Sequence, residues 1–273
     1  MAVARRFKQA VKQATKLIRT AGAAVLAAVA LAGCDEAGVK VPAAPRKTEL
    51  DKAGYVTPPR PTGLTRAVDG TFVLAGEAAP GARVRLATPQ GEAQFAQADD
   101  AGAWLVKLPP SAEARLFGLS MTVGGRQVQA QGYVLVGAHG EVAVLRAGAG
   151  AYVLPEGGGM RVTALDFDAE GGAVVSGIAA ERVAVTVRSD GRQVADGRTG
   201  ASGRFAVAFS APIGAGRHRL TVTSGANEAA ADFDVTPARP LAGAPFRADD
   251  DGDALRVDWL TPGGGLQSTL IRH

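Results

Sequence analysis

The sequence predicts an all-β protein built from two tandem β-sandwiches, and three observations lead to this prediction. Short segments such as 83–86, 119–123, 183–187 and 220–223 alternate apolar and polar residues with a period of two. Stretches rich in Gly, Pro, Asp and Ser separate these segments and are typical of turns. The whole pattern then recurs along the chain at a fixed offset. Many short strands at regular spacing are typical of a sandwich or a barrel.

The repeat becomes visible when the chain is displaced by 101 residues against itself, because turn glycines, strand residues and a large aromatic then coincide without a gap. The matched pairs include Val73 with Val174, Gly76 with Gly177, Gly102 with Gly203, Trp104 with Phe205 and Leu119 with Leu220. Each of the two aromatic residues lies two positions after a turn glycine, at the start of an alternating segment. We therefore expect Trp104 and Phe205 to occupy equivalent positions in the cores of the two sandwiches.

Residues 1–33 are typical of a secretory signal. They contain six basic residues and no acidic residue, and an uncharged run of 13 residues, 21–33, follows the basic part. This run is shorter than the roughly 20 apolar residues that span a bilayer. We therefore expect residues 1–33 to be a signal peptide and no part of the fold.

The location of the charge decides whether nucleic acid is a candidate partner. The whole chain has a net charge of +4 and a pI of about 9.5. Without residues 1–33, 24 basic residues remain against 26 acidic ones, so the net charge becomes −2. Nucleic-acid binding requires clustered Lys and Arg that face phosphates. The sequence therefore predicts no nucleic-acid partner.

The sole cysteine of the chain ends the tetrapeptide Leu31-Ala32-Gly33-Cys34, which resembles the lipobox of bacterial lipoproteins at all four positions. The resemblance implies lipidation of Cys34 by diacylglycerol, cleavage before it, and acylation of the new amino group by a fatty acid such as palmitate. Two or more acyl chains anchor a protein stably. The implied location is the cell envelope, at the inner or outer membrane, facing the periplasm or the cell surface. The alternative is an ordinary secretory signal with a chance cysteine.

The remaining chain divides into four segments. Residues 34–61 contain five prolines and no helical or strand period, so we expect a semi-rigid tether. Residues 62–160 and 161–238 hold the two repeats, and the first includes a trailing hairpin near 140–154. Residues 239–273 are expected to form a C-terminal hairpin.

Both repeats resemble the bacterial immunoglobulin-like domains of envelope and surface proteins. The resemblance rests on segments 76–84 and 177–185, each followed by a hairpin of the form Gly-x-Trp or Gly-x-Phe that ends at Trp104 or Phe205. It covers roughly 64–136 and 162–236 and implies an immunoglobulin-like β-sandwich for each repeat. It implies almost nothing about function, because this fold supports many unrelated tasks.

Motifs for catalysis are missing from the sequence. It contains neither the Gly-x-Ser-x-Gly pattern of hydrolases nor His-Glu-x-x-His, and its three histidines are far apart. A single cysteine excludes a Cys-based zinc site. We therefore expect no catalytic residue, no metal site and no cofactor, and we expect His218 to be a solvent-facing strand residue. An unrecognised hydrolase is a distant alternative.

Two acidic patterns are candidates for metal binding. Residues 249–253 have the charge density of a calcium loop, but their glycine stands fourth, whereas an EF-hand loop has its glycine sixth. A solvated turn explains this run better. Asp166, Asp168 and Glu170 alternate with Phe167, and we expect these acids on the polar face of a strand.

These features predict a non-catalytic, membrane-anchored envelope lipoprotein that serves as a binding or structural module. Its expected partners are the membrane, through the lipid anchor, and an unknown envelope protein or glycan. The alternative function is binding of peptidoglycan or another glycan. Trp259 is the candidate ligand-facing aromatic for that alternative, because the position 101 residues earlier is not aromatic. Burial of its ring in a core is nevertheless the preferred expectation.

Overall fold

The computed structural model describes residues 54–154, 158–250 and 252–273 of the chain. These residues form 19 β-strands. Within these ranges no helix has the length and apolarity that crossing a membrane requires. The predicted signal peptide and lipidation site, Cys34, lie outside the described residues.

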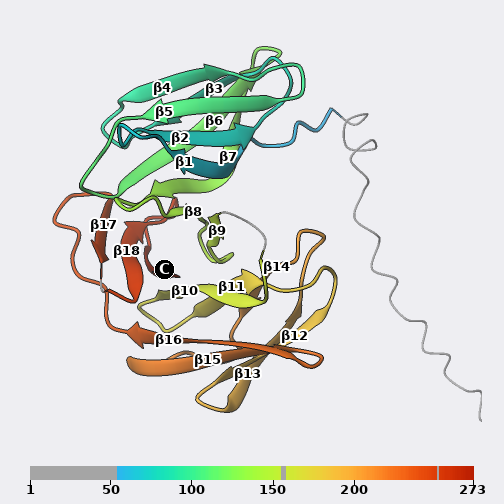
Figure 1. Ribbon diagram of the computed structural model, residues 1–273. Coiled ribbons are helices and arrows are strands. Elements are labelled where there is room, and N and C mark those ends of the chain that lie inside the picture. Colours follow the sequence, from blue (N-terminus) through green and yellow to red (C-terminus); the bar gives the residue numbers. More distant parts are fainter. Residues whose placement is uncertain (1–53, 155–157, 251) are drawn as a thin grey trace, which may run out of the picture. The chain divides into compact units, whose positions relative to one another are not determined.

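The first repeat is a seven-stranded antiparallel sandwich (Figure 1). Its strands are β1 (Arg60–Arg66), β2 (Phe72–Glu77), β3 (Arg83–Ala87), β4 (Ala93–Gln97), β5 (Ala103–Leu108), β6 (Arg115–Val123) and β7 (Arg126–Val136). One sheet has the order β1-β2-β5, and the facing sheet contains β4-β3-β6-β7. Strand β1 begins at Arg60, so the last two residues of the predicted tether belong to the sandwich.

The second repeat has the same seven strands in the same order. They are β10 (Arg161–Asp168), β11 (Ala173–Ile178), β12 (Ala184–Ser189), β13 (Arg192–Arg198), β14 (Arg204–Ala208), β15 (Gly216–Ser224) and β16 (Asn227–Val235). The sheets contain β14-β11-β10 and β13-β12-β15-β16. Even an irregularity recurs, because the register shifts between Pro61 and Gly63 in β1 and between Val162 and Ala164 in β10. The predicted all-β fold of two immunoglobulin-like sandwiches is confirmed.

The conserved spacing of glycine and aromatic residues has a steric cause in each core. Gly76 lies opposite Trp104 on β2 and β5, and Gly177 lies opposite Phe205 on β11 and β14. A Cβ atom at either glycine would overlap the facing aromatic ring. Trp104 and Phe205 are 2% and 4% exposed, so each ring fills its own core as predicted. Each repeat therefore contains the same pair: a glycine without a side chain, and an aromatic ring that fills the space beside it.

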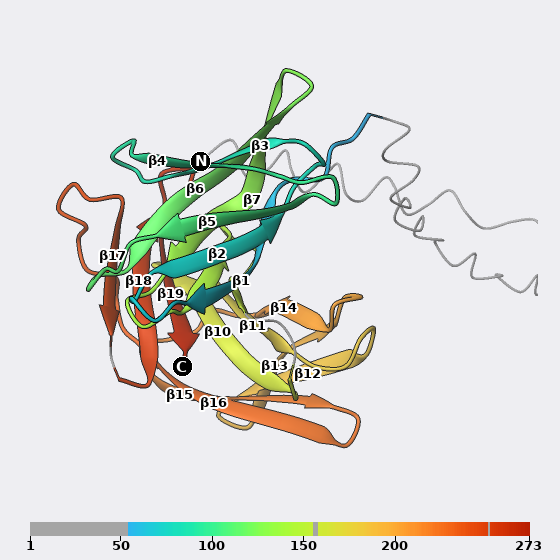
Figure 2. The same ribbon diagram turned by 45° about the horizontal axis from the view of Figure 1, so that its top comes forward.

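The trailing segments extend different sheets in the two repeats. After the first repeat, β8 (Val142–Leu145) and β9 (Tyr152–Leu154) form the predicted hairpin and continue the sheet from β7. After the second repeat, β18 (Ala254–Leu260) and β19 (Leu266–Arg272) form the predicted hairpin, and β17 (Phe246–Asp250) adds a third strand that was not predicted. Strand β19 pairs with β10, which gives the six-stranded order β14-β11-β10-β19-β18-β17 (Figure 2).

A third apolar core joins the two repeats. It combines residues of β6, β7, β8 and the β8–β9 loop with residues of β10, β18 and β19: Leu116, Leu135, Ala143, Leu145, Ala151, Ala164, Leu255, Val257, Trp259 and Ile271. The outer face of the first repeat's sheet is thus covered by the sheet that ends the chain. Burial of this apolar surface stabilises the pairing of the repeats by the hydrophobic effect.

Trp259, the candidate ligand-facing aromatic, does not face a ligand but is buried, which was the preferred expectation. Its side chain has no exposed surface, and its ring meets that of Tyr133 edge to face at a centroid distance of 5.9 Å. The indole N–H donates a hydrogen bond to Thr269 Oγ1 at 3.1 Å. The physical reason is that β18 lies inside a six-stranded sheet whose face is covered by the first repeat.

A buried ion pair fixes the C-terminal strands to the end of the second sandwich. Arg256 and Asp258, two residues apart on β18, are 6% and 1% exposed, and the guanidinium lies 3.0 Å from the carboxylate. Arg256 also donates to the Thr236 hydroxyl and carbonyl at 2.6 and 3.0 Å. Ser268 of β19 donates to Asp258 at 2.7 Å. Such a pair is tolerated inside a protein only when these further hydrogen bonds satisfy both charges.

The two core aromatics give a direct test of the structural repeat. We expect Trp104→Ala and Phe205→Ala each to lower the free energy of unfolding by about 3–5 kcal/mol, because each leaves a cavity that the rigid sheets cannot close. Leu105→Ala is the matched control, since Leu105 neighbours Trp104 and is 63% exposed. Urea denaturation followed by tryptophan fluorescence or circular dichroism measures all three. Losses for the aromatic variants no larger than that of Leu105→Ala would contradict the equivalence of the two cores.

Candidate binding pocket

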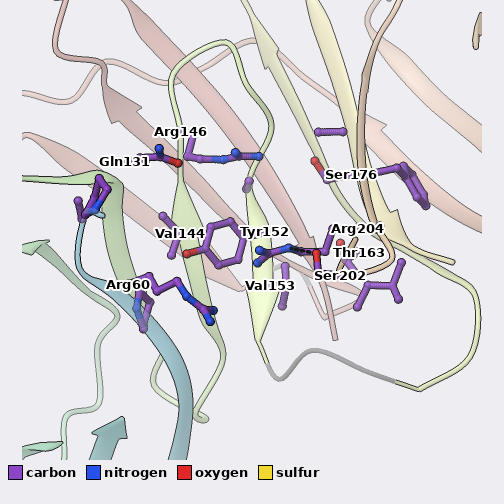
Figure 3. A pocket seen from close by; sticks show the side chains of 18 of the residues that line it. Arg60, Gln131, Val144, Arg146, Tyr152, Val153, Thr163, Ser176, Ser202 and Arg204 are labelled. Carbon is purple, nitrogen blue, oxygen red and sulfur yellow. Dashed lines mark hydrogen bonds between the residues drawn. The ribbon is translucent and has the colours of Figure 1, made fainter. Parts of the chain in front are cut away.

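A pocket of about 340 Å³ lies where the first repeat and its hairpin meet the second repeat. The first repeat contributes the segment around Arg60, the middle of β7 at Gln131, and the β8–β9 hairpin. The second contributes β10, β11 and β14, through side chains that include Thr163, Ser176 and Arg204. Figure 3 shows these side chains directed into one space from both repeats. Such a pocket exists only because the chain joins its repeats through a shared core.

Three arginines surround the tyrosine at the centre of this pocket (Figure 3). The guanidinium carbon of Arg204 lies 4.3 Å from the centroid of the Tyr152 ring, and that of Arg146 lies 5.5 Å from it. Arg60 reaches in from β1 and forms an ion pair with Glu77 at 2.8 Å. None of the described residues that line the pocket is acidic. The described part of the pocket thus places two guanidinium groups against one aromatic ring.

Arg146 is held in place by the loop that it begins. Its Nε donates to the carbonyl of Gly150 at 2.8 Å, and Nη2 donates to that of Ala149 at 2.9 Å. Burial lowers the pKa of the Arg146 guanidinium, and the positive charge of Arg204 lowers it further. The guanidinium groups of Arg146 and Arg204, which both lie beside the Tyr152 ring, are thus close enough to interact electrostatically.

A buried hydroxyl lies on the wall of the pocket. Ser176 on β11 is 2% exposed, and its Oγ has no hydrogen-bond partner among the described residues. Gly150 packs directly over it, and a Cβ atom at Gly150 would come within 2.5 Å of that oxygen. Buried polar atoms usually have a partner, so an unpartnered hydroxyl at a pocket wall is a functional signal.

The wall behind the pocket contains a buried carboxylate that sequence reasoning misplaced. Asp166 was expected on the polar face of a strand, but it is 2% exposed. Its Oδ2 accepts a hydrogen bond from the Ala151 N–H at 2.7 Å, and its Oδ1 accepts from Thr269 Oγ1 at 2.6 Å and Gln267 Nε2 at 2.9 Å. The expectation failed because the first repeat's loop covers the face of β10 that alternation assigns to solvent. Asp168, by contrast, is exposed and accepts bonds from its own turn.

The same network ties the first repeat's loop to the last strand. Gln267, which donates to Asp166, accepts a hydrogen bond from the Gly148 N–H at 3.1 Å. Burial raises the pKa of Asp166 to about 6, although hydrogen bonds from Thr269, Ala151 and Gln267 oppose this rise. Loop 146–151, which carries Arg146, is therefore anchored through its backbone to a buried acid of the second repeat.

Three polar residues in or behind the pocket are positions where the second repeat departs from the first. Asp166, Ser176 and Arg204 correspond at the 101-residue offset to Thr65, Ala75 and Ala103. Each change introduces a charge, or a hydroxyl where the first repeat has a methyl group. The sequence analysis considered only the positions at which the two repeats agree, and it therefore missed these residues. A search for positions at which the repeats differ would have found them.

His218 does not have the surroundings of a catalytic base. The expectation of a solvent-facing side chain is wrong, since it is 17% exposed. Its Nε2 lies 2.9 Å from the carbonyl oxygen of Gly214, and its Nδ1 lies 2.8 Å from Asp190 Oδ2, with Ser189 Oγ at 3.5 Å. Both of the nearer partners only accept hydrogen bonds, so neither ring nitrogen is positioned to take a proton from Ser189.

The acidic run at 249–253 is engaged by basic side chains. Both carboxylate oxygens of Asp249 accept from Arg247, at 2.6 and 3.0 Å, and this contact lowers the pKa of Asp249. Asp250 lies 3.5 Å from the rings of both His139 and His273. Asp249 and Asp250 are the last two residues of strand β17 and do not lie in a free turn. Asp251 lies outside the described residues. Within the described ranges no group of three or more His, Cys, Asp or Glu has the arrangement of a metal site.

Comparison with known proteins yields structural similarity without a family. No family model matches the sequence, and no curated protein matches it. The chain is similar to the BSP domain of a biofilm-associated protein, with 14% identity, a TM-score of 0.24 and coverage of 66% of this chain and 30% of that one. It is similar to invasin, described as a bacterial integrin-binding protein, with 11% identity, a TM-score of 0.21 and coverage of 78% and 54%. It is also similar to the central fibronectin-III array of RIM-binding protein, with 18% identity, a TM-score of 0.26 and coverage of 75% and 72%.

The chain thus spans less than a third of the biofilm-associated protein and about half of invasin. The immunoglobulin-like architecture of each repeat follows from its own strand pairing. At these identities and TM-scores, the similarities say nothing about what this protein binds.

The raised pKa of Asp166 makes stability depend on pH. An ordinary aspartate has a pKa of 3.8, and the folded state raises that of Asp166 to about 6, so protonation favours folding. This contribution is fully present below about pH 4 and is lost as the pH rises through 6, which amounts to about 3 kcal/mol. The free energy of unfolding of Asp166→Asn minus that of the wild type is therefore expected to increase by about 2–3 kcal/mol from pH 4 to pH 7. This change does not depend on the absolute stability of the variant.

Urea denaturation at both pH values measures this gain. Asp234→Asn, at an exposed position in β16, is the control and should show a much smaller change. Equal pH dependence for the two variants would contradict the burial of an ionisable carboxyl group at this junction.

Proposed function

We propose that this protein is a non-catalytic, lipid-anchored component of the bacterial cell envelope, and that its joined repeats act as a binding module with the arginine-lined pocket as the ligand site. The anchor part of the proposal rests on Leu31-Ala32-Gly33-Cys34 and on the short apolar run before it. The binding part rests on the geometry of the two repeats.

The pocket is the observation that carries the binding role. Three arginines and one tyrosine converge in it from three separate elements: β1, the β8–β9 hairpin and β14. Strands and a buried hydrogen-bond network hold these elements, so a ligand would meet preformed groups and little ordering cost. The buried hydroxyl of Ser176 on the wall, which has no partner among the described residues, also favours a binding role over a purely structural one.

A non-catalytic role is favoured by what surrounds the candidate bases. Asp166 is enclosed by three hydrogen-bond donors, and both nitrogens of His218 face acceptors. General acid–base catalysis needs such a group within reach of a substrate in a pocket. The alternative of glycan binding through Trp259 loses its basis, because that ring is buried in the core that joins the repeats.

The anchor is tested by Cys34→Ala. We expect the variant to leave the membrane fraction or to accumulate as an uncleaved precursor, because the thiol that receives the lipid is gone. Membrane fractionation and gel mobility of the full chain measure both outcomes, and labelling with a fatty-acid analogue adds a direct readout. A variant that fractionates and migrates like the wild type would show that the lipoprotein assignment is wrong.

The binding role is tested by cross-linking the mature protein in intact cells and identifying what it captures. We expect a defined partner whose recovery falls in Arg204→Gln and persists in Arg192→Gln. The control removes the same charge from an exposed position of β13. Recovery of the same partners with both variants would show that the partners do not bind in the pocket. Hydrolysis of any captured ligand by the purified protein would refute the non-catalytic role.

A further inference from the structure

We infer that the outer face of the first sandwich, over strands β4, β3, β6 and β7, docks on an anionic lipid surface. These strands form one end of a six-stranded sheet (Figure 2). Two rows of paired residues cross them, and we call the two rows together the Arg83–Arg85 face: Gln97, Arg83, Thr122 and Gln127 in one row, and Phe95, Arg85, Ser120 and Gln129 in the other. The inference rests on the proposed lipid anchor and goes beyond it, because it states how the folded part meets the membrane.

Strand alternation places two arginines and an aromatic ring on the outside of this sheet. Val84 and Leu86 of β3 are fully buried in the core, so Arg83 and Arg85 point the other way. Phe95 pairs with Arg85 across the neighbouring strand and is 50% exposed. The guanidinium carbon of Arg83 lies 4.2 Å from the centroid of the Phe95 ring. The face therefore presents an exposed ring together with two cations.

The charge of the Arg83–Arg85 face selects an anionic partner. Neither guanidinium group forms an ion pair or a hydrogen bond with another described residue. The other residues of the two rows are uncharged, and the acidic residues nearest in sequence lie in the turns at the two ends of β4: Glu92, Asp99 and Asp100. Guanidinium groups donate paired hydrogen bonds that match phosphate oxygens. A second copy docked through the same face would instead bring arginines against arginines, which repel.

The chain enters the first sandwich beside this face. Arg126, which directly precedes Gln127 of the first row, donates a hydrogen bond from Nη1 to the carbonyl oxygen of Gly54 at 3.3 Å. Gly54 lies 20 positions after Cys34, and a chain of that length spans at most roughly 70 Å. A lipid on Cys34 would therefore keep the face close to the membrane. Such confinement raises the effective concentration of the two surfaces, so a weak contact is enough.

The second repeat, which lies further from the proposed anchor along the chain, has other residues at these positions. At the 101-residue offset, Arg83, Arg85 and Phe95 correspond to Ala184, Thr186 and Asp196. Thr186 and Asp196 are paired across β12 and β13 as Arg85 and Phe95 are across β3 and β4, and the Thr186 hydroxyl donates to Asp196 at 2.8 Å. The fold itself thus requires neither the ring nor the cations. Arginines beside an aromatic ring suit a lipid headgroup layer, where cations meet phosphates and the ring enters the interface.

The test measures binding of the mature chain, residues 34–273, to lipid vesicles by co-sedimentation. Residues 1–33 are omitted because their basic and apolar residues would bind vesicles by themselves. One set of vesicles contains phosphatidylcholine alone, and the other contains equal parts of phosphatidylcholine and the anionic phosphatidylglycerol. We expect binding to the anionic vesicles to be about fivefold tighter or more. This binding should weaken several-fold when the salt concentration rises from about 50 to about 300 mM.

Two variants locate the contact on the Arg83–Arg85 face. Arg85→Gln removes a cation, and Phe95→Asp replaces the ring by a charge that anionic lipid repels, so each should weaken binding to anionic vesicles about threefold or more. The matched controls are Arg188→Gln on β12 of the second repeat and Leu105→Asp on β5 of the opposite sheet. Each control makes the same kind of change outside the face and should alter binding less than about twofold. Circular dichroism checks that all four variants are folded.

The outcomes separate this inference from the proposed function. Equal binding to the two kinds of vesicle would overturn the role of lipid charge, and wild-type binding by both Arg85→Gln and Phe95→Asp would overturn the assignment to this face. Undetectable binding to anionic vesicles at millimolar lipid would overturn the inference as a whole. A cross-linked protein or glycan lost in Phe95→Asp would then assign the face to that partner. Because Cys34→Ala tests the anchor without reference to this face, either proposal can fail alone.

Discussion

The buried carboxylate of Asp166 is the constraint on which the joining of the two repeats depends. It accepts hydrogen bonds from Ala151 in the first repeat's loop and from Gln267 and Thr269 on the last strand. A buried acid is costly unless such donors surround it, so loop and strand must both be in place before the carboxylate is satisfied. The loop that is fixed in this way carries Arg146, and β10, which carries Asp166, also contributes Thr163 to the pocket wall. The position of the candidate site therefore follows from one buried group.

The apolar counterpart of this constraint is the core between the repeats. It is formed by the outer face of β6, β7 and β8 and by the inner face of β10, β18 and β19. Trp259 lies within it, and the ion pair of Arg256 with Asp258 ties the same strands to the end of β16. Two sandwiches linked by one segment would be free to reorient, whereas a shared core of this kind favours a fixed arrangement. A pocket whose walls come from both repeats requires such an arrangement.

The repeat explains both the fold and the origin of the site. Gly76 with Trp104 and Gly177 with Phe205 are the same steric solution used twice, and they hold each sandwich together independently. Where the repeats differ, the second one acquires Asp166, Ser176 and Arg204 in place of Thr65, Ala75 and Ala103. Duplication thus supplies two stable scaffolds, and divergence on the face that meets the first repeat supplies polar and charged groups.

The sequence by itself determined the strands, the two sandwiches, the core aromatics and the two trailing hairpins, because alternation and turn residues act over short distances. It could not determine which faces of the strands would be covered. Asp166 was misplaced for this reason, since alternation identifies the two faces of a strand and does not say what packs on the second. Strand β17 and the pairing of β19 with β10 were missed as well, because strands far apart in the chain pair through tertiary packing. The pocket exists only at that level, where Arg60, Arg146 and Arg204 come together from distant parts of the sequence.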